Sequence, residues 1–115
     1  MITVRNIQIP YDRTNVDDVE RFENALAVYQ QRQDEMSHTE YATNSARLLD
    51  GCNAAAELLR NAFPVDIITE TGVNTRSLTE LTDLIIEITT ALMEEEKAMT
   101  ARINTLAKRY GNLRS

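Results

Sequence analysis

Residues 77–110 read SLTELTDLIIEITTALMEEEKAMTARINTLAKRY, and this stretch decides the fold. Its apolar residues recur every three or four positions, which is typical of an amphipathic helix, and Ser77 with Glu80 forms a capping box at its start. At about 1.5 Å of rise per residue the helix is roughly 50 Å long. A compact domain of this chain length has a diameter of about 35 Å. The sequence therefore predicts a helix that projects from its domain or lies against another subunit.

The predicted helix divides into two halves. Between Leu78 and Met93 apolar residues cover most of its circumference, so this half is expected to be enclosed by the core on several sides. Beyond it one narrow apolar stripe remains among charges: Met99, Ile103, Leu106 and Tyr110. Because the seven-residue repeat changes register here, a straight helix in a bundle is favoured over a coiled coil. The second half, from Glu94 to Tyr110, is predicted to project and to bind another protomer or a groove in a different protein.

Charge divides the chain at the same place. All 18 acidic residues lie within residues 1–96, whereas residues 97–115 carry five basic residues and no acid. The charged residues of the second half are Glu94, Glu95, Glu96, Lys97, Arg102, Lys108 and Arg109. We expect these charges to pair with opposite charges on a neighbouring copy. Phosphate binding is a weaker interpretation of the basic end, because cations complement the dipole at a helix C-terminus, where Gly111 would be a natural cap.

Two short apolar runs at the N-terminus indicate a β-hairpin over residues 1–10. Their two-residue alternation changes phase at Asn6, which tolerates the positive φ of a tight turn. A hairpin this small is marginal alone, so it is expected to lie on the helices or to pair with another edge. A first amphipathic helix follows over residues 15–36, capped by Thr14 or Asn15, with acids in the first turn where the helix dipole favours them.

A second helix is expected over residues 38–63. Ser37 and Glu40 fit a capping box at its start, and one continuous helix over residues 15–63 is the alternative. The helix is expected to end at Phe63, because the residue before a proline is pushed out of the helical region.

A linker over residues 65–76 connects this helix to the long one. Its expected core anchors are Ile67 and Ile68, and Gly72 is expected to form a turn. The few glycines and prolines favour long helices over many strands. The sequence thus predicts a single, mainly α domain spanning residues 1–115, with a bundle of three to four helices, a small N-terminal β-hairpin and a long, partly projecting C-terminal helix.

Composition narrows the classes of function. No stretch reaches the roughly 20 apolar residues that a membrane span requires, and the N-terminus has no secretion signal. A cytoplasmic protein is therefore expected. The acidic bulk disfavours broad contact with nucleic acid.

Candidate chemical groups are few. The acids Glu80, Asp83 and Glu87 share one helix face, but a solvated face explains them better than a metal site, since His and Cys are missing nearby. The single cysteine, Cys52, is best explained as a small buried hydrophobic residue, and its pairing with His38 as a nucleophile has no supporting motif. We therefore expect no catalytic, cofactor or metal site and a protein that is not an enzyme.

Residues 7–12, IQIPYD, lead into residues 19–26, VERFENAL. This opening resembles small proteins encoded in the tail modules of phages and prophages of Gram-positive bacteria, in which an Ile-x-Ile-Pro-aromatic-Asp segment precedes an acidic amphipathic helix. A helix bearing Cys52 and a long final helix follow in the same order. The Arg-rich end of those proteins is partly matched by residues 108–114, KRYGNLR.

The resemblance implies a tail-assembly chaperone or tail accessory protein that acts in the host bacterial cytoplasm by binding the tape-measure or tail-tube protein. It implies no catalytic residues. The alternative is a small phage-encoded antagonist of host defence that binds a host effector or sequesters a nucleotide messenger. In the first interpretation, protein binding and self-association depend on the narrow stripe of the long helix.

Overall fold

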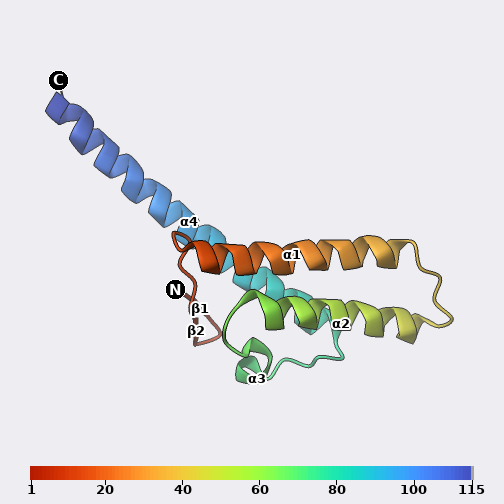
Figure 1. The fold of residues 1–115 in the computed structure, drawn as a ribbon. Coiled ribbons are helices and arrows are strands. Elements are labelled where there is room, and N and C mark those ends of the chain that lie inside the picture. Colours follow the sequence, from red (N-terminus) through yellow and green to blue (C-terminus); the bar gives the residue numbers. More distant parts are fainter. Residues whose placement is uncertain (115) are drawn as a thin grey trace.

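The computed structural model describes the backbone of residues 1–114 and the side chains of residues 1–101, 103–105 and 108. Its elements, in order, are β1 (Ile2–Val4), β2 (Ile7–Ile9), α1 (Val16–Ser37), α2 (Asn44–Ala62), α3 (Ile67–Thr71) and α4 (Leu78–Arg114). The predicted fold class is confirmed: the chain is mainly helical, with a small N-terminal hairpin and a long C-terminal helix (Figure 1). In the described part of the chain, none of the helices has the length and apolar character needed to cross a membrane.

The hairpin forms as the sequence predicts. β1 and β2 pair antiparallel, with Ile2 opposite Ile9. Asn6 has a φ of 64° and Arg5 a φ of 50°, so both turn residues are left-handed, as a two-residue hairpin loop requires. Ile2 and Val4 are buried against the helices, because β1 lies beside α4 and β2 beside α3.

α1 and α2 form an antiparallel helical hairpin. The side chain of Asn15 accepts a hydrogen bond from the amide of Asp18 at 3.1 Å and begins α1. The predicted capping box at Ser37 is wrong, because the Ser37 hydroxyl donates back to the Asp34 carbonyl at 2.6 Å and α1 ends there.

The second helix begins later than residue 38. α2 starts at Asn44, where the Thr43 hydroxyl accepts from the amide of Ala46 at 3.1 Å. Residues 15–63 therefore hold two helices joined by a loop. The C-terminal end of α2 is as predicted, since Phe63 is extended before Pro64.

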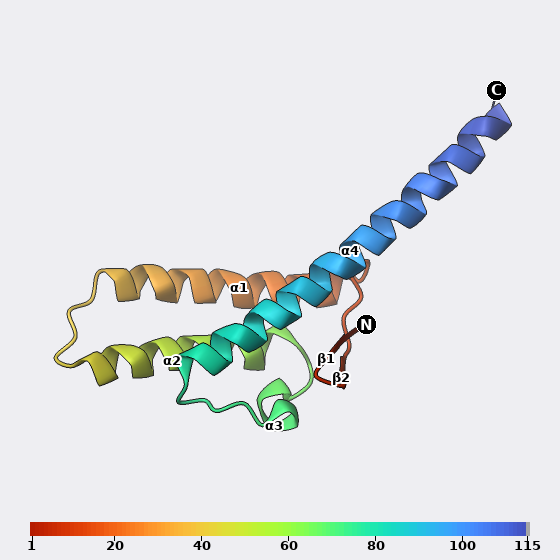
Figure 2. The ribbon, with the colours of Figure 1, turned by 180° about the vertical axis from the view of Figure 1, so that it is seen from behind.

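A polar cluster ties the loop between α1 and α2 to both helices. Arg32 on α1 contacts Asp50 at 3.0 Å and Glu57 at 2.8 Å, and the Tyr41 hydroxyl donates to Asp50 at 2.6 Å. The hydrogen bond from Tyr41 and then the pairing with Arg32 lower the pKa of Asp50 below its ordinary value. This cluster fixes the end of the helical hairpin that lies farthest from the chain termini (Figure 2).

The predicted linker over residues 65–76 contains a short helix. Asp66 caps α3 by accepting from the amide of Thr69 at 3.1 Å, and Gly72 ends it with a φ of 67°. The expected turn at Gly72 is confirmed. Ile67 is buried and Ile68 packs against the core, so both expected anchors contribute to it.

The core lies where α2, the first half of α4 and the hairpin meet. Ala55, Leu81 and Leu84 are fully buried there. Three aromatic rings pack beside them, with the ring centroid of Phe22 at 6.0 Å from that of Tyr11 and 5.8 Å from that of Phe63.

α4 is longer than predicted and continues to Arg114. The expected cap at Gly111 is wrong, since the helix runs through it, and glycine inside a helix costs only about 1 kcal/mol relative to alanine. The second half of the helix extends away from the other elements in both views (Figures 1 and 2). The radius of gyration is 18.1 Å, against about 13 Å for a compact domain of this size. The predicted projection is thus confirmed.

Candidate functional site

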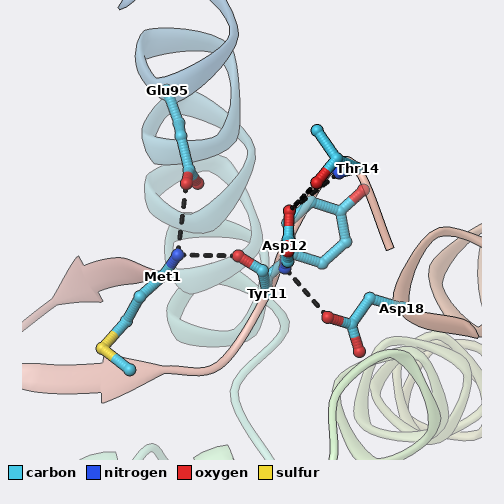
Figure 3. Close-up of polar contacts among 6 residues, drawn as sticks. All are labelled: Met1, Tyr11, Asp12, Thr14, Asp18 and Glu95. Atoms are coloured by element: carbon cyan, nitrogen blue, oxygen red, sulfur yellow. Dashed lines mark hydrogen bonds and ion pairs between the residues drawn. The ribbon is translucent and has the colours of Figure 1, made fainter. Parts of the chain in front are cut away.

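The N-terminal segment is bound to the middle of α4 by charged groups. The amino group of Met1 contacts Glu95 at 3.1 Å and the carbonyl oxygen of Tyr11 at 2.7 Å (Figure 3). Arg13 contacts Glu96 at 3.5 Å. Two of the three adjacent acids that we expected to face another copy therefore bind the chain's own N-terminal segment.

The third contact holds the hairpin turn. Arg5 places Nε at 2.8 Å and Nη2 at 2.6 Å from the same carboxylate oxygen of Glu87. The hairpin and the segment after it therefore follow α4 along its packed half and stop where that half ends.

Local hydrogen bonds shape the segment between β2 and α1. Asp12 accepts from the amide and the hydroxyl of Thr14 at 2.9 and 2.6 Å, and these bonds lower the pKa of Asp12 below its ordinary value. The amide of Asp12 donates to Asp18 on α1 at 2.9 Å (Figure 3). This turn holds Tyr11 and Arg13 at one end of a groove.

The groove lies between α1 and α4 and has a volume of about 410 Å³. Val19, Phe22 and Leu26 line it from α1, and Leu92 and Met93 line it from α4. A smaller hollow of about 70 Å³ continues between α1, α2 and α4. The walls of the groove are thus mainly apolar, and burial beside it raises the pKa of Tyr11 above its ordinary value.

The end of the groove near the N-terminus of α1 is acidic. A second hollow of about 280 Å³ adjoins it through Arg13 and Val19, and is also lined by Glu20 and Glu23. Among the residues that line the groove or this adjoining hollow, Arg13 is the one cation, and it pairs with Glu96. An apolar floor beside carboxylates suits an amphipathic helix that carries basic residues.

The open groove corrects one expectation. The first half of α4 was predicted to be enclosed on several sides, yet Ile86 is 60% exposed and Met93 is 56% exposed. Met93 lines the groove, where α1 diverges from α4 and leaves that side of α4 uncovered. Only the side that faces α2 and the hairpin is closed.

The projecting half of α4 begins at Lys97 rather than at Glu94 as predicted, because Glu95 and Glu96 bind the N-terminal segment. It continues the packed face of the helix. Met99 lies seven residues beyond Leu92, which packs against the core, so the two share a side of the helix. Met99 is half-buried and Ile103 is 56% exposed. The apolar face therefore extends past the last element that covers it.

The other predicted residues of this half are placed only in part. Lys97 and Lys108 are exposed, and Lys97 lies 3.7 Å from Glu94 in the same helix. The predicted contributions of Leu106, Tyr110, Arg102 and Arg109 fall outside the described side chains.

The remaining candidates from the sequence are Cys52, His38 and the acidic face of α4. Cys52 is buried in α2 as expected, while the exposed ring of His38 contacts the Asp34 carbonyl at the end of α1. Glu87 is paired with Arg5. Among the residues that the structure describes, His, Cys, Asp and Glu side chains form no group that could hold a metal ion.

Comparison of the chain with protein-family models, curated proteins and solved structures finds no match. Two surfaces of this molecule are candidates for binding: the groove between α1 and α4, and the projecting half of α4. Sequence reasoning found the second and missed the first. The sequence signal of the groove is weak, because Met93, which lines it, lies off the main stripe in a way that also fits a fully buried helix.

Proposed function

We propose that this chain is a non-enzymatic interaction protein that binds through the projecting half of α4. The observation that carries the proposal is the apolar face that continues through Met99 to the exposed Ile103. A helix face of this kind binds a groove or another helix by burying its regularly spaced apolar side chains. The basic residues beside the stripe would select an acidic partner.

Tail assembly is the more specific form of this proposal, and it rests on the resemblance of residues 7–12 and 19–26. A tail-assembly chaperone would use the projecting helix to bind the tape-measure or tail-tube protein. A protein that binds such a partner during assembly needs an accessible binding helix attached to a folded domain. The two halves of α4 supply that combination.

The alternative of a nucleotide-sequestering protein has less support. Phosphate groups are commonly bound by unpaired cations or at helix N-termini. The groove offers Arg13 alone, and this side chain is paired with Glu96. The neighbouring Glu20 and Glu23 would repel a phosphate.

The test compares two variants of the full chain. Ile103→Glu places a charge on the stripe, while Thr105→Glu places the same charge two positions on, about 200° around the helix. We expect the intact chain to self-associate or to bind a co-expressed tape-measure or tail-tube protein in sedimentation velocity. Ile103→Glu should lose this association and Thr105→Glu should keep it. A monomeric intact chain that binds neither tail protein would contradict the proposal.

A further inference from the structure

We propose that the groove between α1 and α4 receives the projecting half of α4 from a second copy of this chain, and that the two copies do so reciprocally. The inference rests on the proposed function and names the partner of the projecting half. It follows from the shape of the groove, from charge and from the position of both surfaces on one helix.

The apolar surfaces match in kind. Phe22 and Leu26 on α1 and Met93 on α4 line a groove of about 410 Å³, a volume that accommodates several side chains. The projecting half offers Met99 and Ile103 at helical spacing. Inserting these side chains between α1 and α4 would cover the apolar surface on both copies.

The charges match in sign. Glu20, Glu23 and Glu96 line the groove and the hollow beside it. The projecting half carries basic residues and no acid after position 96. A second copy therefore brings opposite charge to the groove, whereas an acidic helix from another protein would be repelled.

Reciprocity follows from the order of the surfaces along α4. The wall of the groove ends at Glu96, and the projecting half begins at the next residue. Two α4 helices that overlap antiparallel about this point place each projecting half beside the other copy's groove, which closes a two-fold pair. A parallel overlap would instead place two basic halves together.

A charge-reversal experiment on the full chain tests the inference. The groove variant is Glu20→Lys with Glu23→Lys, and the helix variant is Lys97→Glu with Arg102→Glu. Within either variant alone, both contacts of the pair join like charges. In a mixture of the two, each basic helix meets an acidic groove and each acidic helix meets a basic groove, so both contacts are restored.

Controls carry the same change of charge elsewhere. Asp34→Lys with Glu35→Lys changes the far end of α1, and Arg47→Glu with Arg76→Glu changes α2 and the loop before α4. Circular dichroism at matched concentration confirms that each variant is folded. Sedimentation equilibrium gives the dissociation constants, and native mass spectrometry identifies the mixed pair by mass.

We expect a dimer for the intact chain and for both controls. Each charge-reversal variant should dissociate at least about tenfold more readily, and the mixture should form a one-to-one pair with affinity near that of the intact chain. The inference is overturned if the groove variant associates like the intact chain, or if mixing restores nothing. In those cases loss of association in Ile103→Glu would leave the proposed function standing. An intact chain that stays monomeric also overturns the inference, while its binding to a tail protein would still support the proposed function.

Discussion

The two halves of α4 share one helix and one apolar spacing but differ in what covers them. Leu81 and Leu84 in the packed half are fully buried under α2 and the hairpin, whereas Ile103 in the projecting half is 56% exposed. The apolar pattern does not stop where the domain stops. This exposed apolar face is the observation on which the proposed binding role rests, because exposed apolar stripes of this kind are costly to leave in water.

The largest effect should come from truncating a side chain in the packed half. Leu84→Ala is expected to reduce the free energy of unfolding by about 2–5 kcal/mol, because it opens a cavity in a fully enclosed site. Ile103→Ala should change it by less than about 0.5 kcal/mol at a concentration where the chain is monomeric. Urea unfolding measures both values. Equal losses of unfolding free energy in the two variants would contradict the difference in burial between the two halves of α4.

Deleting the projecting half sharpens the same contrast. A chain that ends at Lys97 keeps the contacts of Glu95 and Glu96 with Met1 and Arg13. We expect its free energy of unfolding to lie within about 1 kcal/mol of that of the intact monomer. A substantially larger loss would mean that the projecting half stabilises its own domain.

A smaller effect is expected from the ion pair that holds the hairpin turn on α4. Arg5→Gln removes the contact with Glu87, and both side chains are partly exposed. The expected loss of unfolding free energy is about 0–1 kcal/mol. Arg47→Gln, on α2, is the matched control because the Arg47 guanidinium hydrogen-bonds only to Asn44 among the described residues. If Arg5→Gln releases the hairpin, faster amide exchange in β1 will show it.

A feature of the fold could be predicted from the sequence when it depends on residues that are close together in the chain. The hairpin turn and the end of α2 at Phe63 follow from neighbours in the chain, and the structure confirms them. The cap of α1 was predicted at Thr14 or Asn15 and lies at Asn15. The predicted start of α2 was wrong because Ser37 and Thr43 are both suitable helix caps. The Ser37 hydroxyl bonds within α1 instead, and Thr43 caps α2.

The groove could not be predicted, since it depends on how far α1 diverges from α4. The same is true of the pairing of Arg5 with Glu87, which lie 82 residues apart in the sequence. In both cases the residues are visible in the sequence but their partners are set by packing. The projecting half was predictable because the length of a helix follows from its number of residues and the size of a domain follows from the chain length. Neither quantity depends on how the side chains pack.

The smallest expected effect concerns pH. In the folded chain the Tyr41 hydroxyl and Arg32 lower the pKa of Asp50 below its ordinary 3.8. The stability from this site is therefore fully present above about pH 4 and is lost as the pH falls through the lower folded-state pKa. In Tyr41→Phe the carboxyl carbon of Asp50 should titrate at higher pH by NMR, and an unchanged titration would contradict this assignment.

The pH dependence also separates the two halves of the molecule. Every acidic side chain of the chain lies within residues 1–96. The chain that ends at Lys97 should therefore lose stability over the same acidic range as the intact monomer. A shifted range would place a titrating contact on the projecting half.

Hydrogen exchange along α4, measured at low and at high protein concentration, tests the central claim most directly. Residues 78–93 should be protected at both concentrations, because their amides open only with the core. Residues 97–110 should exchange rapidly in the dilute monomer and become protected as the chain associates. Protection of this half in the dilute monomer, or rapid exchange at every concentration and with every tail protein tested, would contradict a helix that is uncovered alone and covered by a partner.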